Sequence, residues 1–134
     1  MKIEFTDELL TYVPEMDNQH KKLVELVNKV SDLLKLGDTK TAMDILSKEL
    51  KAYVDTHFDA EEKFMESIGF PKLESHRKIH EAFRKQVYEY VNSLKEGDIE
   101  AFREALSLTW SWLFNHIATV DKDYGIFAKE KGLI

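Results

Sequence analysis

The histidines of this chain recur together with acidic residues in a pattern that could hold metal ions. All 5 histidines belong to the pattern, and two carboxylates accompany them. The candidate ligands are His20, His57, Glu61, His76, His80, His116 and Asp121. Imidazole and carboxylate groups suit zinc, iron, manganese, copper or nickel, so the residue types alone do not choose the metal. A single zinc ion takes four ligands, whereas seven are roughly what two six-coordinate ions need when some ligands bridge.

Apolar residues that repeat with a period near 3.6 predict four helices that carry these ligands. The main stripes are Leu23, Val27, Val30 and Leu34; Met43, Leu46, Leu50 and Val54; Phe83, Val87, Val91 and Leu94; and Phe102, Leu106, Thr109 and Leu113. Breaks at Gly37-Asp38, Gly69-Phe70-Pro71 and Gly97-Asp98 separate the helices, with glycine suited to end a helix and aspartate to cap the next. Such short connections predict an all-α fold, an antiparallel up-down-up-down four-helix bundle.

The candidate ligands lie on the apolar stripes, and all fall at one end of the predicted bundle. His20 is near the start of the first helix and His57 near the end of the second. His76 and His80 are near the start of the third helix, and His116 is near the end of the fourth. Antiparallel order brings these positions to one level. Burying such groups without a metal would cost on the order of 1–3 kcal/mol for each unsatisfied group, so the pattern favours a metal cluster.

One domain is expected over residues 1–134, with an N-terminal arm at 1–17, the bundle at 18–122 and a tail at 123–134. The arm has apolar residues without a helical period and is expected to pack on the bundle. The tail is expected to form a short turn of helix ending at Gly132. Asp121 follows His116 by five residues, about 140° around a regular α-helix. Either a π-type turn brings it inward, or it reaches in from a fraying helix end.

Composition excludes several classes of protein. The formal net charge of −6 and the pI of about 5.4 argue against a nucleic-acid partner. No apolar run approaches the roughly 18 residues that a membrane span needs. Without cysteine there is no disulfide, thiolate zinc site or iron–sulfur cluster. A cytoplasmic protein is expected.

Four segments together resemble the hemerythrin family, most closely its prokaryotic single-domain members. They are Asp17–His20, His57–Glu62, His76–His80 and His116–Asp121. The resemblance covers essentially the whole chain, and the intervals between its histidines and acids are highly specific.

The resemblance implies a non-haem centre of two iron ions, cycling between Fe2+ and Fe3+. One iron would be held by His76, His80 and His116, and the other by His20 and His57. Glu61 and Asp121 would bridge the irons together with an oxo or hydroxo group. The iron with two histidines would keep an open position for dioxygen, inside an apolar pocket. The pocket residues would be Leu23, Phe58, Trp112, Leu113 and Ile117.

The implied function is reversible dioxygen binding for storage, transport or sensing, and not catalysis. Two other classes of function use similar ligands. A diiron enzyme could reduce peroxide, dioxygen or nitric oxide, and a metal buffer or zinc-stabilised bundle could use the same side chains. The sequence identifies no protein partner.

Overall fold

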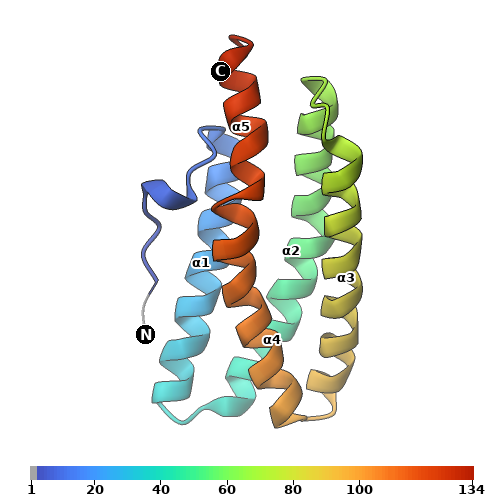
Figure 1. The fold of residues 1–134 in the computed structure, drawn as a ribbon. Helices are drawn as coiled ribbons and strands as arrows, with labels where there is room; N and C mark the ends of the chain where they lie inside the picture. The colour runs from blue at the N-terminus through green and yellow to red at the C-terminus, as the bar shows by residue number, and fades with distance from the viewer. Residues whose placement is uncertain (1–2) are drawn as a thin grey trace.

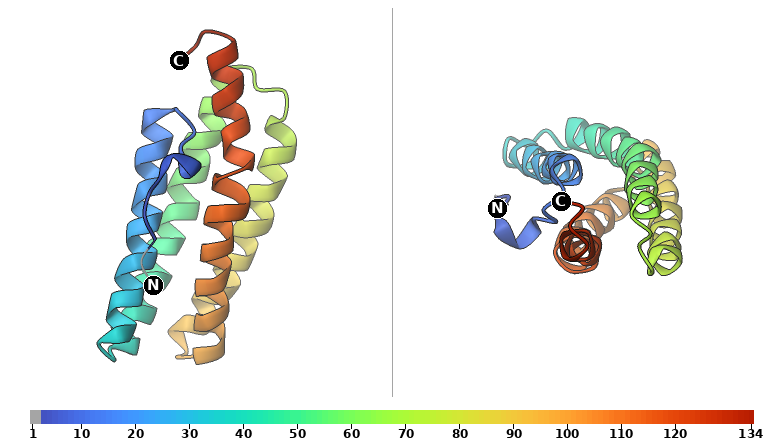
Figure 2. Two further views of the ribbon diagram at one scale, coloured as in Figure 1. Left: turned by 60° about the vertical axis from the view of Figure 1, so that its left-hand side comes forward. Right: turned by 90° about the horizontal axis from the view of Figure 1, so that it is seen from above.

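A computed structural model describes residues 3–134 and shows the predicted all-helical bundle, without a strand among those residues. The four long helices are α1 (Pro14–Lys35), α2 (Thr39–Ser67), α3 (Leu73–Lys95) and α4 (Ile99–Trp112). Neighbouring helices run antiparallel and surround a common core (Figures 1 and 2). None of the described helices combines the length and apolar character that crossing a bilayer requires.

The helix breaks have the predicted chemistry. Gly37 and Gly97 follow α1 and α3 with φ of 80° and 81°, a left-handed conformation that glycine adopts without steric cost. Asp38 and Asp98 then cap α2 and α4, each accepting the backbone N–H three residues later, at 3.2 and 3.1 Å. These short turns hold the four helices in their antiparallel order.

The core changes character along the bundle axis. Aliphatic side chains fill the half near the α1–α2 and α3–α4 connections, where Val30, Leu46, Leu50 and Val87 are fully buried. Larger aromatic and polar side chains occupy the other half, where α1 begins, α2 ends and α3 begins. The aliphatic half therefore gives a rigid base to the half that carries the histidines.

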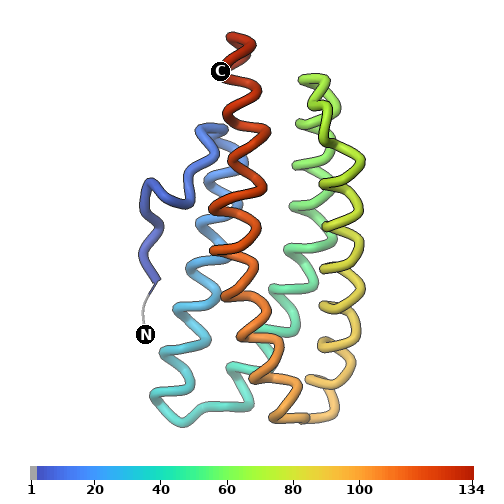
Figure 3. The backbone as a smooth tube through the Cα atoms, viewed as in Figure 1, coloured from blue at the N-terminus to red at the C-terminus, as the bar shows by residue number. Residues whose placement is uncertain are grey.

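The fourth helix continues through a π-helical turn. This turn, η2 (Leu113–Ile117), joins α4 to α5 (Val120–Glu130), and the backbone runs on in one direction (Figure 3). A π turn holds one more residue than an α turn, which offsets the awkward spacing of His116 and Asp121. The first of the two predicted alternatives is thus confirmed, and Asp121 is fully buried. Helix α5 is also longer than the short turn expected for the tail.

The N-terminal segment packs on the bundle, but less of it is an arm than expected. A 3-10 turn, η1 (Asp7–Leu9), contacts η2, and Leu9 is buried. Helix α1 then begins at Pro14 and not after residue 17. Proline suits the first position of a helix because its fixed φ matches the helix and its missing N–H is not needed there.

A close backbone contact fastens the arm to α5. The Asp17 carboxylate accepts the backbone N–H groups of Thr11 at 2.7 Å and Tyr12 at 3.1 Å, and Tyr12 has a φ of 69°. The Thr11 carbonyl then lies so close to Gly125 that a Cβ there would be 1.8 Å from its oxygen. Only glycine allows this approach.

Candidate metal centre

All five histidines converge on one buried region at the end of the bundle. They come from four elements: His20 from α1, His57 from α2, His76 and His80 from α3, and His116 from η2. Each is at most 4% exposed. In every case Nε2 approaches a carboxylate oxygen of Glu61 or Asp121. The antiparallel order therefore brings the predicted residues together.

Glu61 lies between two groups of histidines. Its Oε2 is 3.1 Å from Nε2 of both His20 and His57. Its Oε1 is 3.3 Å from Nε2 of His76 and 2.9 Å from Nε2 of His80. The two oxygens of one carboxylate thus face different imidazoles.

Asp121 has the same two-sided arrangement. Its Oδ1 is 2.8 Å from Nε2 of His76 and 2.9 Å from Nε2 of His116, whereas its Oδ2 is 3.3 Å from Nε2 of His20. Helix α5 delivers this carboxylate from the far side of η2. Both carboxylates therefore span the gap between His20 and the α3 histidines.

Several buried atoms of this cluster lack hydrogen-bond partners within the described residues. They are His20 Nδ1, Glu61 Oε1, Nε2 of His76, His80 and His116, and both Asp121 carboxylate oxygens. The contacts of Asp121 Oδ1 with Nε2 of His76 and His116 are short, yet these atoms are not oriented for hydrogen bonding. Unsatisfied buried polar atoms are costly, and a cation would satisfy several at once. The residues therefore fit a metal site.

The ligand atoms form two overlapping groups. One contains Glu61, His76, His80, His116 and Asp121, and the other contains His20, His57 and Glu61. Within each group the ligand atoms lie within 4.8 Å of one another. Each group could hold a metal ion, and Glu61 is common to both groups.

Interactions between the buried imidazoles and carboxylates favour the charged forms of most of these groups. Burial alone would lower the pKa of His20 and His76, but Asp121 and Glu61 outweigh it and raise these pKa values to about 10 and about 9. Burial opposes ionisation of Glu61 and Asp121 too, yet the surrounding imidazoles hold the pKa of both carboxyls well below the ordinary range. For His116 burial prevails and lowers the pKa. Protons thus occupy positions that a cation would take.

Two outer side chains orient the imidazoles, and the sequence reasoning missed both. The Nδ1 of His57 contacts Gln19 Oε1, and the Nδ1 of His80 lies 2.9 Å from Glu62 Oε2. Arg77 in turn donates to Glu62 at 3.1 Å. An acceptor at Nδ1 keeps the proton there and leaves Nε2 free as a metal ligand. Gln19 and Glu62 each adjoin a candidate ligand in sequence, which was the available signal.

Tyr124 is a third residue that the sequence reasoning missed. Its hydroxyl donates to Glu61 Oε2 at 2.8 Å from a fully buried position. It follows Asp121 by three residues on α5, so the two share a helix face. That spacing was the signal. Tyr124 fixes the orientation of the Glu61 carboxylate.

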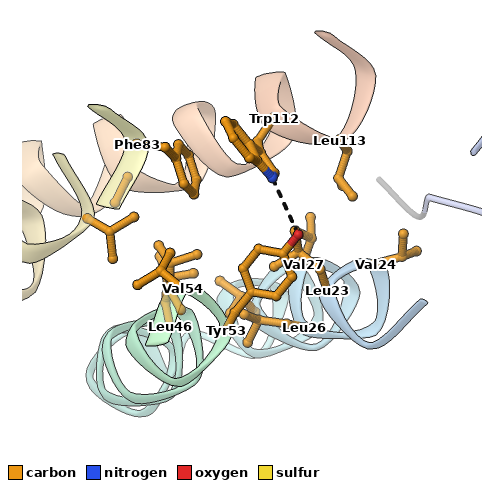
Figure 4. Close-up of a cluster of buried hydrophobic side chains, with 14 of the residues drawn as sticks. Leu23, Val24, Leu26, Val27, Leu46, Tyr53, Val54, Phe83, Trp112 and Leu113 are labelled. Carbon is orange, nitrogen blue, oxygen red and sulfur yellow. Dashed lines mark hydrogen bonds between the residues drawn. The ribbon is translucent and has the colours of Figure 1, made fainter. Parts of the chain in front are cut away.

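The five expected pocket residues, Leu23, Phe58, Trp112, Leu113 and Ile117, are all buried beside the cluster. Phe58 stacks on His80, with ring centroids 4.0 Å apart, and Trp112 stacks on His116 at 3.7 Å. Figure 4 shows Trp112 and Leu113 facing Leu23 across the bundle. These side chains form an apolar wall on one side of the candidate site.

Tyr53 adds a polar atom to this apolar wall, and the sequence did not lead us to expect it there. Its ring stacks on His57 with centroids 4.7 Å apart. Its hydroxyl accepts the indole N–H of Trp112 at 3.4 Å, the dashed line in Figure 4. Tyr53 precedes His57 by one helical turn, as Trp112 precedes His116, so the stacking could have been inferred from spacing.

Comparisons with known proteins point to the same family as the sequence pattern. The family model "Hemerythrin HHE cation binding domain" matches residues 11–125. A bacteriohemerythrin of Pseudomonas aeruginosa is 37% identical over 118 residues, covering 88% of this chain and 76% of the relative. A bacteriohemerythrin of Clostridium acetobutylicum is 35% identical over 125 residues, covering 88% of this chain and 95% of the relative. Both the matched family and the extent of these similarities confirm the resemblance seen in the sequence. The chain belongs to the hemerythrin family.

Proposed function

We propose that this protein binds dioxygen reversibly at a pair of iron ions. One observation carries the proposal: Glu61 and Asp121 each direct one oxygen to one group of histidines and the other oxygen to the second group. A carboxylate that bridges two ions requires this arrangement. Iron is the metal of hemerythrin domains, and a donor set of imidazole and carboxylate suits it.

The two ions would have unequal ligand sets. His76, His80 and His116 would hold one, and His20 and His57 the other, with both carboxylates shared. The second ion would have one imidazole fewer and therefore room for an external ligand. When bound, the iron pair supplies the electrons that dioxygen takes up on binding and returns on release.

The protein's own residues would make binding reversible. Phe58, Leu113 and Ile117 are fully buried beside the cluster and exclude water and anions that would compete with the gas. Gln19 and Glu62 hold the imidazoles of His57 and His80 in orientation. Tyr124 holds the carboxylate of Glu61. Fixed ligands limit the rearrangement that gas binding requires.

The test is metal analysis combined with a spectrum of the reduced protein exposed to air and then to vacuum. We expect about two irons per chain, following the ligand count of two six-coordinate ions, and an absorption band that vacuum abolishes. An irreversible change would instead indicate an enzyme, and no band with zinc bound would indicate a structural or buffering role.

A matched pair of variants makes the test specific. Asp121→Asn removes a buried shared ligand and should reduce both the iron content and the reversible band. Asp123→Asn, two residues away on α5, alters an exposed carboxylate that pairs with Lys72 at 3.6 Å and should leave both unchanged. Equal behaviour of the two variants would contradict the assignment of Asp121.

A further inference from the structure

Two surface pockets reach the metal centre from opposite sides. One, of about 280 Å³, lies between α1 and α2 and is lined by Leu23, Tyr53 and His57. The other, of about 380 Å³, lies between α3 and α4 and is lined by Trp112 and His116. Each therefore ends on a candidate metal ligand and on an aromatic ring stacked upon that ligand.

We propose that the pocket between α1 and α2 is the entrance through which a small uncharged gas reaches the centre, and that Tyr53 and Leu23 form the wall that opens. The proposal rests on the proposed function for the identity of the gas and for the choice of the side with fewer protein ligands. The route itself is a property of the protein.

The ligand sets favour this side. The pocket between α1 and α2 touches His57, which belongs to the group of three candidate ligands with His20 and Glu61. The opposite pocket touches His116, which belongs to the group of five. An external ligand needs the position with fewer protein donors, so the shorter path to it begins between α1 and α2.

The wall on this side is also the easier to move. The Tyr53 hydroxyl and the Trp112 indole nitrogen are 3.4 Å apart, longer than the usual hydrogen bond of about 2.9–3.0 Å. Trp112, which would have to move on the other side, is stacked between Phe83 at 3.9 Å and His116 at 3.7 Å. Figure 4 shows Tyr53 reaching from α2 toward Trp112, with Leu23 nearby. Rotation of Tyr53 would open a path to the interior.

Size and charge indicate the class of ligand. A volume of about 280 Å³ is below the roughly 300–1,000 Å³ of pockets that hold drug-sized molecules. It is ample for a diatomic gas, since one water occupies about 30 Å³ of the liquid. Lys22 and Glu49 both line this pocket, and their opposite charges give no preference for an anion. An uncharged gas fits best.

Trp112 can report the arrival of gas because its indole nitrogen contacts the Tyr53 hydroxyl. It also lines the opposite pocket, so the experiment is carried out with that pocket filled by Ala82→Phe. The chain has 2 tryptophans, and Trp110→Phe leaves Trp112 as the sole emitter. The full chain would be loaded with zinc, which takes the same kinds of ligand and has no redox chemistry. Dissolved dioxygen is the probe, and dynamic quenching of Trp112 fluorescence is the measurement.

Phenylalanine substitutions at Ala52 and Ala82 provide a matched pair of variants, each of which fills one of the two pockets. Both are exposed helical alanines, Ala52 in the pocket between α1 and α2 and Ala82 in the opposite pocket. Ala82→Phe should remove only the quenching that arrives through the opposite pocket, which Trp112 itself lines. Adding Ala52→Phe to this variant should then lower the remaining quenching constant severalfold. Thr56→Phe, also in the first pocket, should act like Ala52→Phe. Quenching that neither Ala52→Phe nor Thr56→Phe lowers further in the Ala82→Phe background would overturn the proposal.

The iron-loaded protein gives a second readout. Ala52→Phe should slow dioxygen association and dissociation by the same factor, because it alters the path and not the bound state, so the equilibrium constant should not change. Rates of association and dissociation that stay unchanged in Ala52→Phe, or a change in only one of the two, would refute the entrance. Failure of the iron protein to bind gas would refute the proposed function but would not alter the quenching result.

Discussion

Gly125 offers a sharp test of how the arm and the metal centre are connected. Replacing a helical glycine with alanine ordinarily stabilises a protein by about 1 kcal/mol, because alanine favours the helix. At Gly125 the new methyl group would lie 1.8 Å from the Thr11 carbonyl oxygen and 2.8 Å from its carbon. Nonbonded carbons normally lie about 3.5–4.0 Å apart, so the arm and α5 must separate by roughly 1 Å or more.

The clash should outweigh the gain in helix propensity. Overpacking in a close-packed region costs about 1–3 kcal/mol, and the upper end applies because the atoms approached are backbone. Subtracting about 1 kcal/mol of helix propensity leaves a net loss of about 2 kcal/mol. For a chain of this size that loss lowers Tm by roughly 8 °C.

Thermal unfolding of the iron-loaded protein, followed by far-ultraviolet circular dichroism, measures this change in Tm. The control is Ile126→Ala, an exposed position on α5, which should change stability by less than about 0.5 kcal/mol. Gly125→Ala should also speed iron loss during dialysis, because α5 carries Asp121 and Tyr124. An increase in Tm would refute the reasoning, since it would mean that helix propensity outweighs the backbone contact.

Three further predictions concern the centre itself. Glu62→Ala removes the partner of His80 Nδ1 and should weaken iron binding about 10–100-fold. The control is Glu66→Ala, an exposed position one turn later on α2, which should leave iron binding unchanged. Equal iron affinities of the two variants in a chelator titration would contradict the role of Glu62. The pKa values of about 10 for His20 and about 9 for His76 mean that metal binding at neutral pH displaces about two protons from these rings, so affinity should rise with pH. Calorimetry in buffers of different ionisation enthalpy measures this release, and a value of zero would exclude it. Without metal, the stability that these raised pKa values contribute is complete below the ordinary pKa of 6.5 and is lost as the pH rises through about 9 and 10. Leu113→Asp places a charge beside the centre and should speed oxidation of the oxygenated protein, measured by the decay of its absorption band; an unchanged lifetime would count against the dry pocket.

Periodicity was sufficient to predict the helices and the level at which the ligands meet. The stripe that contains Leu46, Leu50 and Val54 continues into His57, and the same holds on each helix. Once the connections are short, antiparallel order fixes which helix ends adjoin. The five-residue interval before Asp121 even required a departure from regular α-helix, which η2 supplies.

Contacts that depend on how the helices rotate against one another could not be predicted from the sequence. The pairing of Gln19 with His57 joins residues 38 positions apart, and that of Tyr124 with Glu61 spans 63 positions. Neither follows from the period of a single helix. The early start of α1 was missed because residues 1–17, which include Pro14, were assigned to the arm, although proline also suits the first position of a helix.

The position of Glu61 has a consequence for how the site fills. If two ions bind as proposed, both take an oxygen of this one carboxylate, so the affinity for the second ion depends on whether the first is bound. The iron content of the protein would then follow the iron supply as one linked pair of sites and not as two independent ones.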